Sequence, residues 1–160
     1  MNLITDRTAA DTQRKKELAA KGYANMTTAE KTEWNAGLKG AYKYSDLNRV
    51  GQACADMYAA LTEAGYAVPG YTALPINWAR GDRPTPADLQ TYLATVAAIK
   101  AALPTATPIP STMRRITVED ANNIEKMLLE VEDILNRIAR TYVRSGVYHS
   151  GAVIYVAEAI

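Results

Sequence analysis

The sequence has no phenylalanine and only one cysteine and one histidine, which narrows the chemistry that it can support. Cys54 has no second cysteine with which to form a disulfide, and His149 has no further histidine or cysteine with which to hold zinc. His149 is next to Ser150, but adjacency along the chain does not provide the geometry of a nucleophile and its base. We therefore expect no metal, no cofactor and no catalytic residue, and we expect that the protein is not an enzyme.

A strong net charge and a long apolar run are lacking as well. Eighteen Lys and Arg residues against seventeen Asp and Glu residues give a formal net charge of +1, whereas proteins that bind nucleic acids need a clustered positive field. No run approaches the ~20 apolar residues of a membrane span, and Asp6 and Arg7 lie where a secretory signal would be apolar. We expect neither a nucleic acid nor a membrane as a partner.

The aromatic rings that are present all carry a polar group, because the chain has ten Tyr and two Trp. Such rings suit half-buried positions and interfaces, although compositional drift would give the same bias. Cys54 lies among Ala53, Ala55 and Met57, which predicts a small buried hydrophobe, with a reactive thiol as the alternative.

Apolar residues recur at steps of three and four in several segments, the spacing that lines one face of a helix. Thr27 and Glu30 form a capping-box pattern, and Thr85 is followed by Pro86 at the first helical position. The expected helices are residues 8–21 with Thr5 or Asp6 near the cap, a segment from residue 27, a segment from the cap residue Ser45 to Gly65, residues 85–103, and residues 117–145. We predict a mainly α fold, an antiparallel helical bundle of about five helices.

Two connections in this bundle are unusual. Residues 66–84 have no periodicity and contain several Pro and Gly residues around Tyr71 and Trp78, so we expect a long exposed Pro/Gly loop whose rings contact a partner. Prolines then make residues 104–113 an extended spacer. The alternative is that these connections fold back onto the bundle.

The fifth expected helix has the most regular apolar stripe. The stripe consists of Ala121, Ile124, Leu128, Val131, Leu135, Ile138 and Tyr142. Its period also fits a coiled-coil seam between subunits, but a single stretch of this length favours packing within the chain. The carboxylates between stripe positions are expected to face solvent, and these are Glu125, Glu130, Glu132 and Asp133. Lys126 with Glu130, and Asp133 with Arg137, have the spacing of surface pairs.

Residues 147–160 change character, because they are β-branched, aromatic and almost uncharged after a helix that is expected to end at Ser145 and Gly146. A β-prone C-terminal tail has to pair or pack, within the chain or on another subunit, to satisfy its backbone groups. We therefore expect a helical bundle domain, residues 1–146, and a tail for subunit or partner contact, residues 147–160. The expected partner-binding residues are Tyr71, Trp78, Tyr148, Val153, Ile154, Tyr155 and Val156.

The segment GLKGAYKYSDLNRVG at residues 37–51 has a distinctive composition, and it occurs with further motifs along the whole chain. These are residues 3–8, residues 26–34, Asn77 and Trp78 followed by residues 84–86, residues 119–125, and the Ser-Gly pairs near the end. In these motifs the chain resembles a family of small proteins encoded by phages and prophages of Gram-positive gut bacteria. The motifs are structural, and no catalytic residue is carried over from the family.

The resemblance implies a bacteriophage virion structural protein, associated with the tail or baseplate and assembled in the host cytoplasm. Its expected partners are other virion proteins or copies of itself, in a homo-oligomer. The alternative comes from another class of function: a phage-encoded adaptor or anti-defence protein that binds a host protein in the cytoplasm. An enzyme that uses the exposed carboxylates ranks far behind both.

Overall fold

The computed structural model describes the backbone of residues 1–157 and the side chains of residues 1–141. Within these limits the chain is mainly α, as predicted, with five α-helices and one short 3₁₀ helix. The elements are α1 (Ala9–Lys21), η1 (Tyr23–Asn25), α2 (Thr28–Ala36), α3 (Tyr44–Glu63), α4 (Pro86–Ala102) and α5 (Val118–Ala157).

Four of the five helices begin with a capping box. In each box, a threonine side chain accepts a hydrogen bond from the backbone N–H three residues on. The acidic side chain at that third position accepts a hydrogen bond from the backbone N–H of the threonine. The pairs are Thr8 with Asp11, Thr27 with Glu30, Thr85 with Asp88, and Thr117 with Asp120. The boxes at Thr27 and Thr85 confirm the predicted starts. Two predicted caps are wrong: Thr8 caps α1, and Ser45 lies inside α3, whose N-cap is Lys43.

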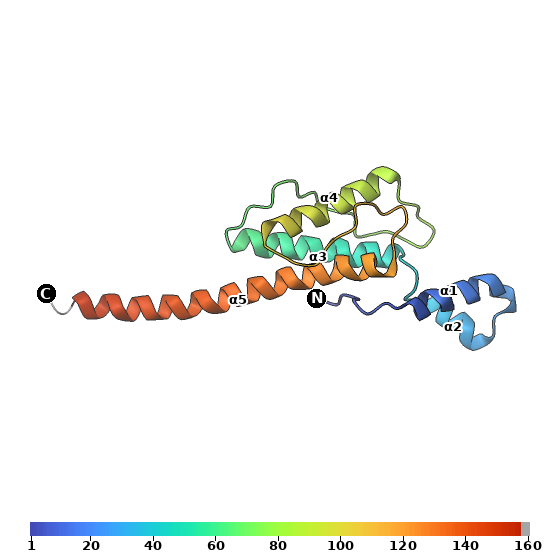
Figure 1. Cartoon of the computed structure of the whole chain (residues 1–160), viewed down its shortest axis with the longest axis horizontal. Helices are drawn as coiled ribbons and strands as arrows, with labels where there is room; N and C mark the ends of the chain where they lie inside the picture. The colour runs from blue at the N-terminus through green and yellow to red at the C-terminus, as the bar shows by residue number, and fades with distance from the viewer. Residues whose placement is uncertain (158–160) are drawn as a thin grey trace.

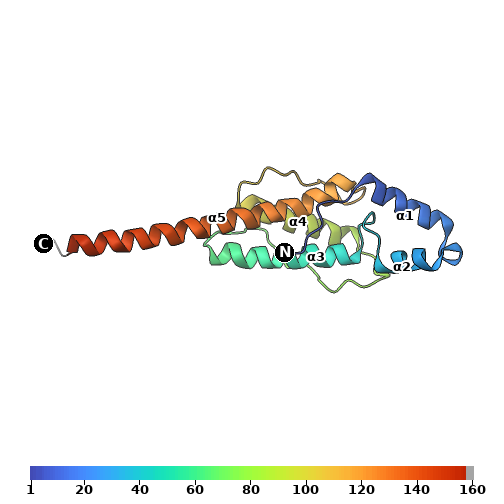
Figure 2. The same ribbon diagram turned by 90° about the horizontal axis from the view of Figure 1, so that it is seen from below.

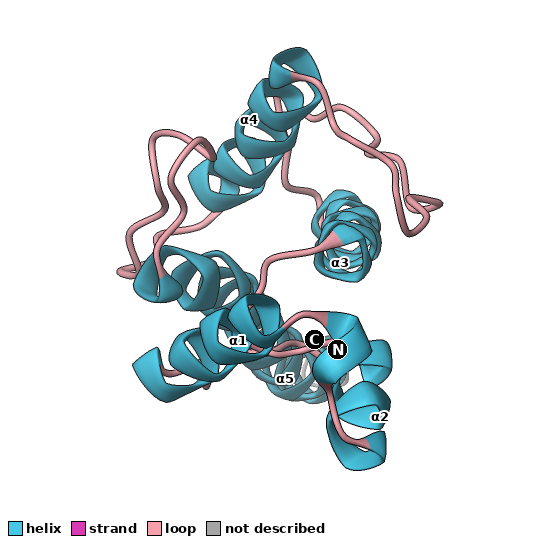
Figure 3. Ribbon diagram, turned by 90° about the vertical axis from the view of Figure 1, so that its right-hand side faces the viewer, coloured by secondary structure: helices cyan, strands magenta, loops and turns pink. Residues whose placement is uncertain are grey.

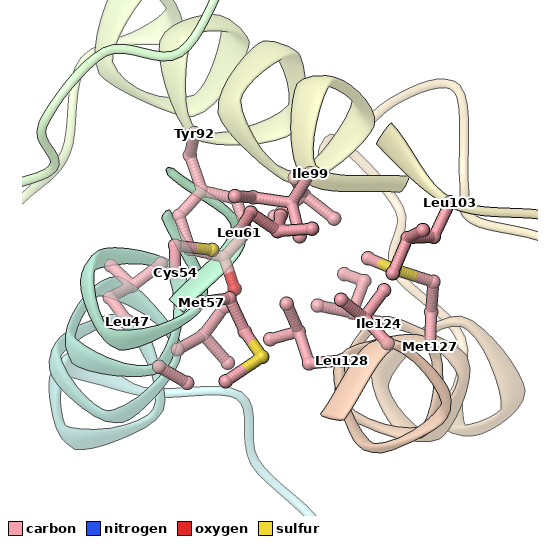
Figure 4. Packing of buried hydrophobic residues seen from close by; sticks show 14 residues of the cluster. Leu47, Cys54, Met57, Leu61, Tyr92, Ile99, Leu103, Ile124, Met127 and Leu128 are labelled. Carbon is pink, nitrogen blue, oxygen red and sulfur yellow. The ribbon is translucent and has the colours of Figure 1, made fainter. Parts of the chain in front are cut away.

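The core lies between α3, α4 and α5, which form the three corners of the body when the molecule is viewed end-on (Figure 3). Apolar side chains from all three helices point toward one another in the space between them (Figure 4). The predicted apolar stripe of α5 is confirmed from Ala121 to Ile138, and the side chain of Tyr142 lies outside the described ones. Cys54 is free and fully buried, as predicted, and burial raises the pKa of its thiol to about 12.

The three core helices run in the same direction, so the predicted antiparallel arrangement is wrong for the body (Figure 1). Arg7 hydrogen-bonds to both Asp46, near the start of α3, and Glu125, near the start of α5. The starts of these two helices therefore lie at the same end of the body. Leu47 near the start of α3 shares a small cavity with Leu89 near the start of α4. A parallel neighbour requires a connection that returns along the whole helix, roughly 30 Å for twenty residues. The two long connections, residues 64–85 and 103–117, provide that return.

The helices α1 and α2 form a hairpin that extends from one end of the body, while α5 extends from the other end (Figures 1 and 2). Leu18 and Met26 are buried in the hairpin. At Gly40, in the connection to α3, an added Cβ atom would lie 2.1 Å from the backbone oxygen of Asp11. Glycine is therefore required where this connection crosses the start of α1.

The helix α5 does not end at Ser145 and Gly146 but continues to Ala157, so the prediction of a β-prone conformation fails for residues 147–157. Glycine weakens a helix by only about 1 kcal/mol relative to alanine, and the segment has no proline to break it. The predicted domain boundary at residue 146 falls inside this continuous helix. Residues 158–160 lie outside the described residues.

Candidate interaction surfaces

Four charged side chains form a cluster inside the body, which we call the buried ion cluster: Arg7, Asp46, Arg49 and Glu125. The Arg7 guanidinium donates to Asp46 Oδ1 at 3.0 Å and to Glu125 Oε1 at 2.6 Å. Arg49 donates to Glu125 Oε2 at 2.9 Å and to Glu125 Oε1 at 2.7 Å. Glu125 is fully buried, so the prediction that it faces solvent is wrong.

The buried ion cluster joins three parts of the chain that are distant in sequence. Residues 1–8 run along α5, where the N–H of Ile4 donates to Glu125 Oε2 at 2.6 Å. Arg7 and Asn122 exchange two hydrogen bonds, from Arg7 N to Asn122 Oδ1 at 3.0 Å and from Asn122 Nδ2 to the Arg7 carbonyl at 2.9 Å. The cluster therefore holds the first residues of the chain against α3 and α5.

Two tyrosines close the cluster on the side of α4. The guanidinium carbon of Arg7 lies 5.6 Å from the centroid of the Tyr42 ring, within the range of a cation–π contact. The hydroxyl groups of Tyr42 and Tyr92 share a short hydrogen bond, and burial raises the pKa of both phenols, so both stay protonated at neutral pH.

The geometry of the buried ion cluster is that of a structural site. Each oxygen of Glu125 and Asp46 accepts at least one hydrogen bond from an arginine or a backbone N–H. Two positive and two negative groups balance, which is the condition under which buried charges are tolerated. The cluster therefore holds residues 1–8, α3 and α5 in position relative to one another.

The two predicted contact rings of the long loop are packed against the body. Tyr71 stacks on Tyr58 of α3, with ring centroids 3.9 Å apart and an interplanar angle of 8°. The backbone of Trp78 exchanges two hydrogen bonds with the side chain of Asn48, at 2.9 Å and 2.8 Å. Both rings are half-buried, so the expectation that they are displayed on an exposed loop is wrong. Their role in partner binding stays a prediction, and the large hydrophobic side chain that this loop exposes is Ile76.

The proline spacer is also fixed to the body. Thr107 donates from its N–H to Glu130 Oε2 at 3.1 Å, and its hydroxyl donates to the other carboxylate oxygen. These hydrogen bonds lower the pKa of Glu130. Of the carboxylates expected to face solvent, Glu130 is therefore bonded within the chain, while Asp133 is exposed and pairs with Arg137 as predicted.

The helix α5 continues beyond the body as a projecting rod (Figure 1). Ile134, Leu135 and Ile138 are the last of its hydrophobic side chains that pack against the core within the part whose side chains are described. Residues 118–141 include nine charged residues, whereas residues 142–157 include one, Arg144. We call residues 142–157 the α5 extension. Of the predicted contact residues, Tyr148, Val153, Ile154, Tyr155 and Val156 belong to it, and their side chains lie outside the described ones.

The buried ion cluster is not predictable from local sequence patterns. The position of Glu125 is the feature of the sequence that could have indicated a buried charge. It lies four residues after Ala121 and three before Leu128, on the edge of the apolar stripe. Its partners Arg7 and Arg49 are 118 and 76 residues away, and no local spacing connects them.

Among residues 1–157, no helix combines the length and hydropathy needed to cross a membrane. The described side chains contain no group of three or more His, Cys, Asp or Glu that could hold a metal ion. Comparison with protein-family models, with curated proteins and with solved structures gave no match.

Proposed function

We propose that the protein is a structural subunit that acts by protein–protein assembly through the α5 extension. The observation that carries this proposal is that α5 continues past the body, and that the sixteen residues of the α5 extension include one charged residue. A helix with so few charges is stable in water only if it is covered, because a polar face normally separates a helix from solvent. The body offers it no cover, since the rod points away from α3 and α4 (Figure 1).

The sequence motifs at residues 37–51 and elsewhere supply the biological setting of the proposal. They favour a bacteriophage virion protein of the tail or baseplate, with other virion proteins or further copies of this chain as partners. The elongated shape, with the hairpin at one end and the α5 extension at the other, suits a subunit that connects neighbours.

Mass spectrometry of purified particles tests this setting. We expect the protein in stoichiometric amounts in particles that carry the full chain, and its loss from particles when the chain ends at Thr141. Particles that lack the full-length protein would contradict a virion role and would favour the adaptor that binds a host protein inside the infected cell.

A further inference from the structure

A second surface lies at the opposite end of the body, where the hairpin joins it. It is a pocket of about 350 Å³ between the end of α2, the connection to α3 and the first turn of α3, which we call the junction pocket. Trp34, Leu38 and Tyr44 supply apolar surface to its lining. Trp and Tyr are the side chains that most often anchor a bound partner.

The junction pocket has an uncompensated positive charge. Lys15, Lys43 and Arg80 line it, and no acidic side chain is part of the lining. None of these three forms an ion pair within the described part of the chain, whereas Arg14 and Lys21 of the same hairpin are paired with Glu33 and Glu30. Three unpaired cations around one hollow, in a protein of formal net charge +1, create a local positive potential that attracts anions.

The ammonium group of Lys43 lies where a side chain at position 37 would be. Gly37 has a φ of +90°, and a Cβ atom at this position would lie 2.1 Å from the Nζ atom of Lys43. The absence of a side chain at Gly37 therefore allows the ammonium group to occupy the wall of the junction pocket. The positive φ is the reason that glycine is required here, because the flexible Lys43 side chain could move aside for a Cβ atom.

We propose that the junction pocket binds an acidic segment of a partner protein, with one apolar side chain of that segment seated against Trp34 and Tyr44. The cations come from α1, the cap of α3 and the long loop, so they suit several separate carboxylates along a peptide. A single inorganic anion binds most tightly where several hydrogen-bond donors converge on it, and an apolar wall adds nothing to its affinity. A nucleic acid requires a longer row of phosphate contacts than three cations provide.

The experiment is a titration of the ¹⁵N-labelled full chain with an acetylated and amidated peptide of sequence Glu-Glu-Leu-Glu-Glu, followed by NMR. We expect a saturable shift of the Trp34 indole N–H and of backbone resonances around the pocket, with affinity that falls as salt is added. Lys15→Glu combined with Arg80→Glu should weaken binding by about tenfold or more. The matched control is Lys16→Glu combined with Arg83→Glu, which changes exposed residues outside the pocket by the same formal charge and should bind like the unmodified chain.

Several outcomes would overturn the proposal. These are no shift at Trp34, an equal loss of binding in both double variants, or inorganic phosphate that binds as tightly as the peptide. Tighter binding of a single-stranded oligonucleotide would replace the peptide with a nucleic acid. The pocket lies outside the α5 extension, so failure here leaves the proposed assembly function standing, and the reverse also holds.

Discussion

The burial of a single residue can be predicted from the sequence where its neighbours are apolar. The prediction fails where a charged side chain is buried with a partner that is distant in sequence. The burial of Cys54 is predictable because Ala53, Ala55 and Met57 surround it in sequence. Glu125 was assigned to solvent because a lone carboxylate is expensive to bury, and the arginines that compensate for its charge come from elsewhere in the chain. Periodicity locates a face, but it does not identify a partner across 118 residues.

The substitution Glu125→Gln tests the buried ion cluster. It leaves two guanidinium groups against the single carboxylate of Asp46, so we expect the free energy of unfolding to fall by about 3–5 kcal/mol. Urea denaturation measures the change. The control is Glu132→Gln, which alters a partly exposed carboxylate 3.5 Å from the N-terminal ammonium and should change stability by about 0.5 kcal/mol or less. Equal midpoints for the two variants would contradict the assignment of a structural role to the cluster.

The thiol of Cys54 provides a second test at this scale. Because burial raises its pKa to about 12, the thiolate that reacts with disulfide reagents is scarce at neutral pH, and the side chain has no access to solvent. We expect a chromogenic thiol reagent to react slowly with the native protein and at once in denaturant. Rapid reaction in native buffer would revive the alternative of a reactive cysteine.

Helix starts were predicted well from the sequence, whereas the end of α5 and the packing of the two rings in the long loop were not. The boxes at Thr27 and Thr85 are complete within four residues, so the sequence contains all the information that specifies them. The end of α5 was misplaced because Gly146 is a weak stop inside a helix that is already formed. The packing of Tyr71 and Trp78 could not be predicted from local sequence, because their contacts Tyr58 and Asn48 lie on a separate helix.

The capping box of α2 predicts that the stability of the protein depends on pH. Hydrogen bonds from Lys21 and from the Thr27 N–H lower the pKa of Glu30 from 4.5 to about 2. In the unfolded chain this carboxyl binds its proton at a higher pH, so its contribution to stability is present above pH 4.5 and is lost as the pH falls through about 2. We expect Glu30→Gln to lower the melting temperature above pH 4.5 and to match the unmodified protein near pH 2. A difference that is constant across this range would contradict the assignment.

Asn48 tests the attachment of the long loop to the body. Asn48→Ala removes both hydrogen bonds to the backbone of Trp78, each worth about 1 kcal/mol, and should loosen the part of the loop around Trp78. Limited proteolysis should then cut this segment faster. Gln52→Ala, one turn later on the exposed side of α3, is the control and should leave the cleavage rate unchanged. Equal cleavage of the two variants would show that Asn48 does not hold the loop.

At the scale of the whole molecule, the fold class was predictable and the direction of the helices was not. Periodicity gives the number of helices, but short loops are the reason to expect antiparallel neighbours, and this chain has connections of about twenty and fifteen residues. Connections of that length are what a parallel arrangement needs, so the long loop was itself the signal. The same arrangement leaves the hairpin and the α5 extension at opposite ends.

We propose that the body is complete without the α5 extension, which is left free to bind other subunits. Sedimentation velocity of the full chain and of a chain that ends at Thr141 tests it most directly. We expect an assembly of two or more copies for the full chain, and a monomer with an unchanged melting temperature for the shortened one. A monomeric full chain, or a shortened chain that assembles as the full one does, would contradict it.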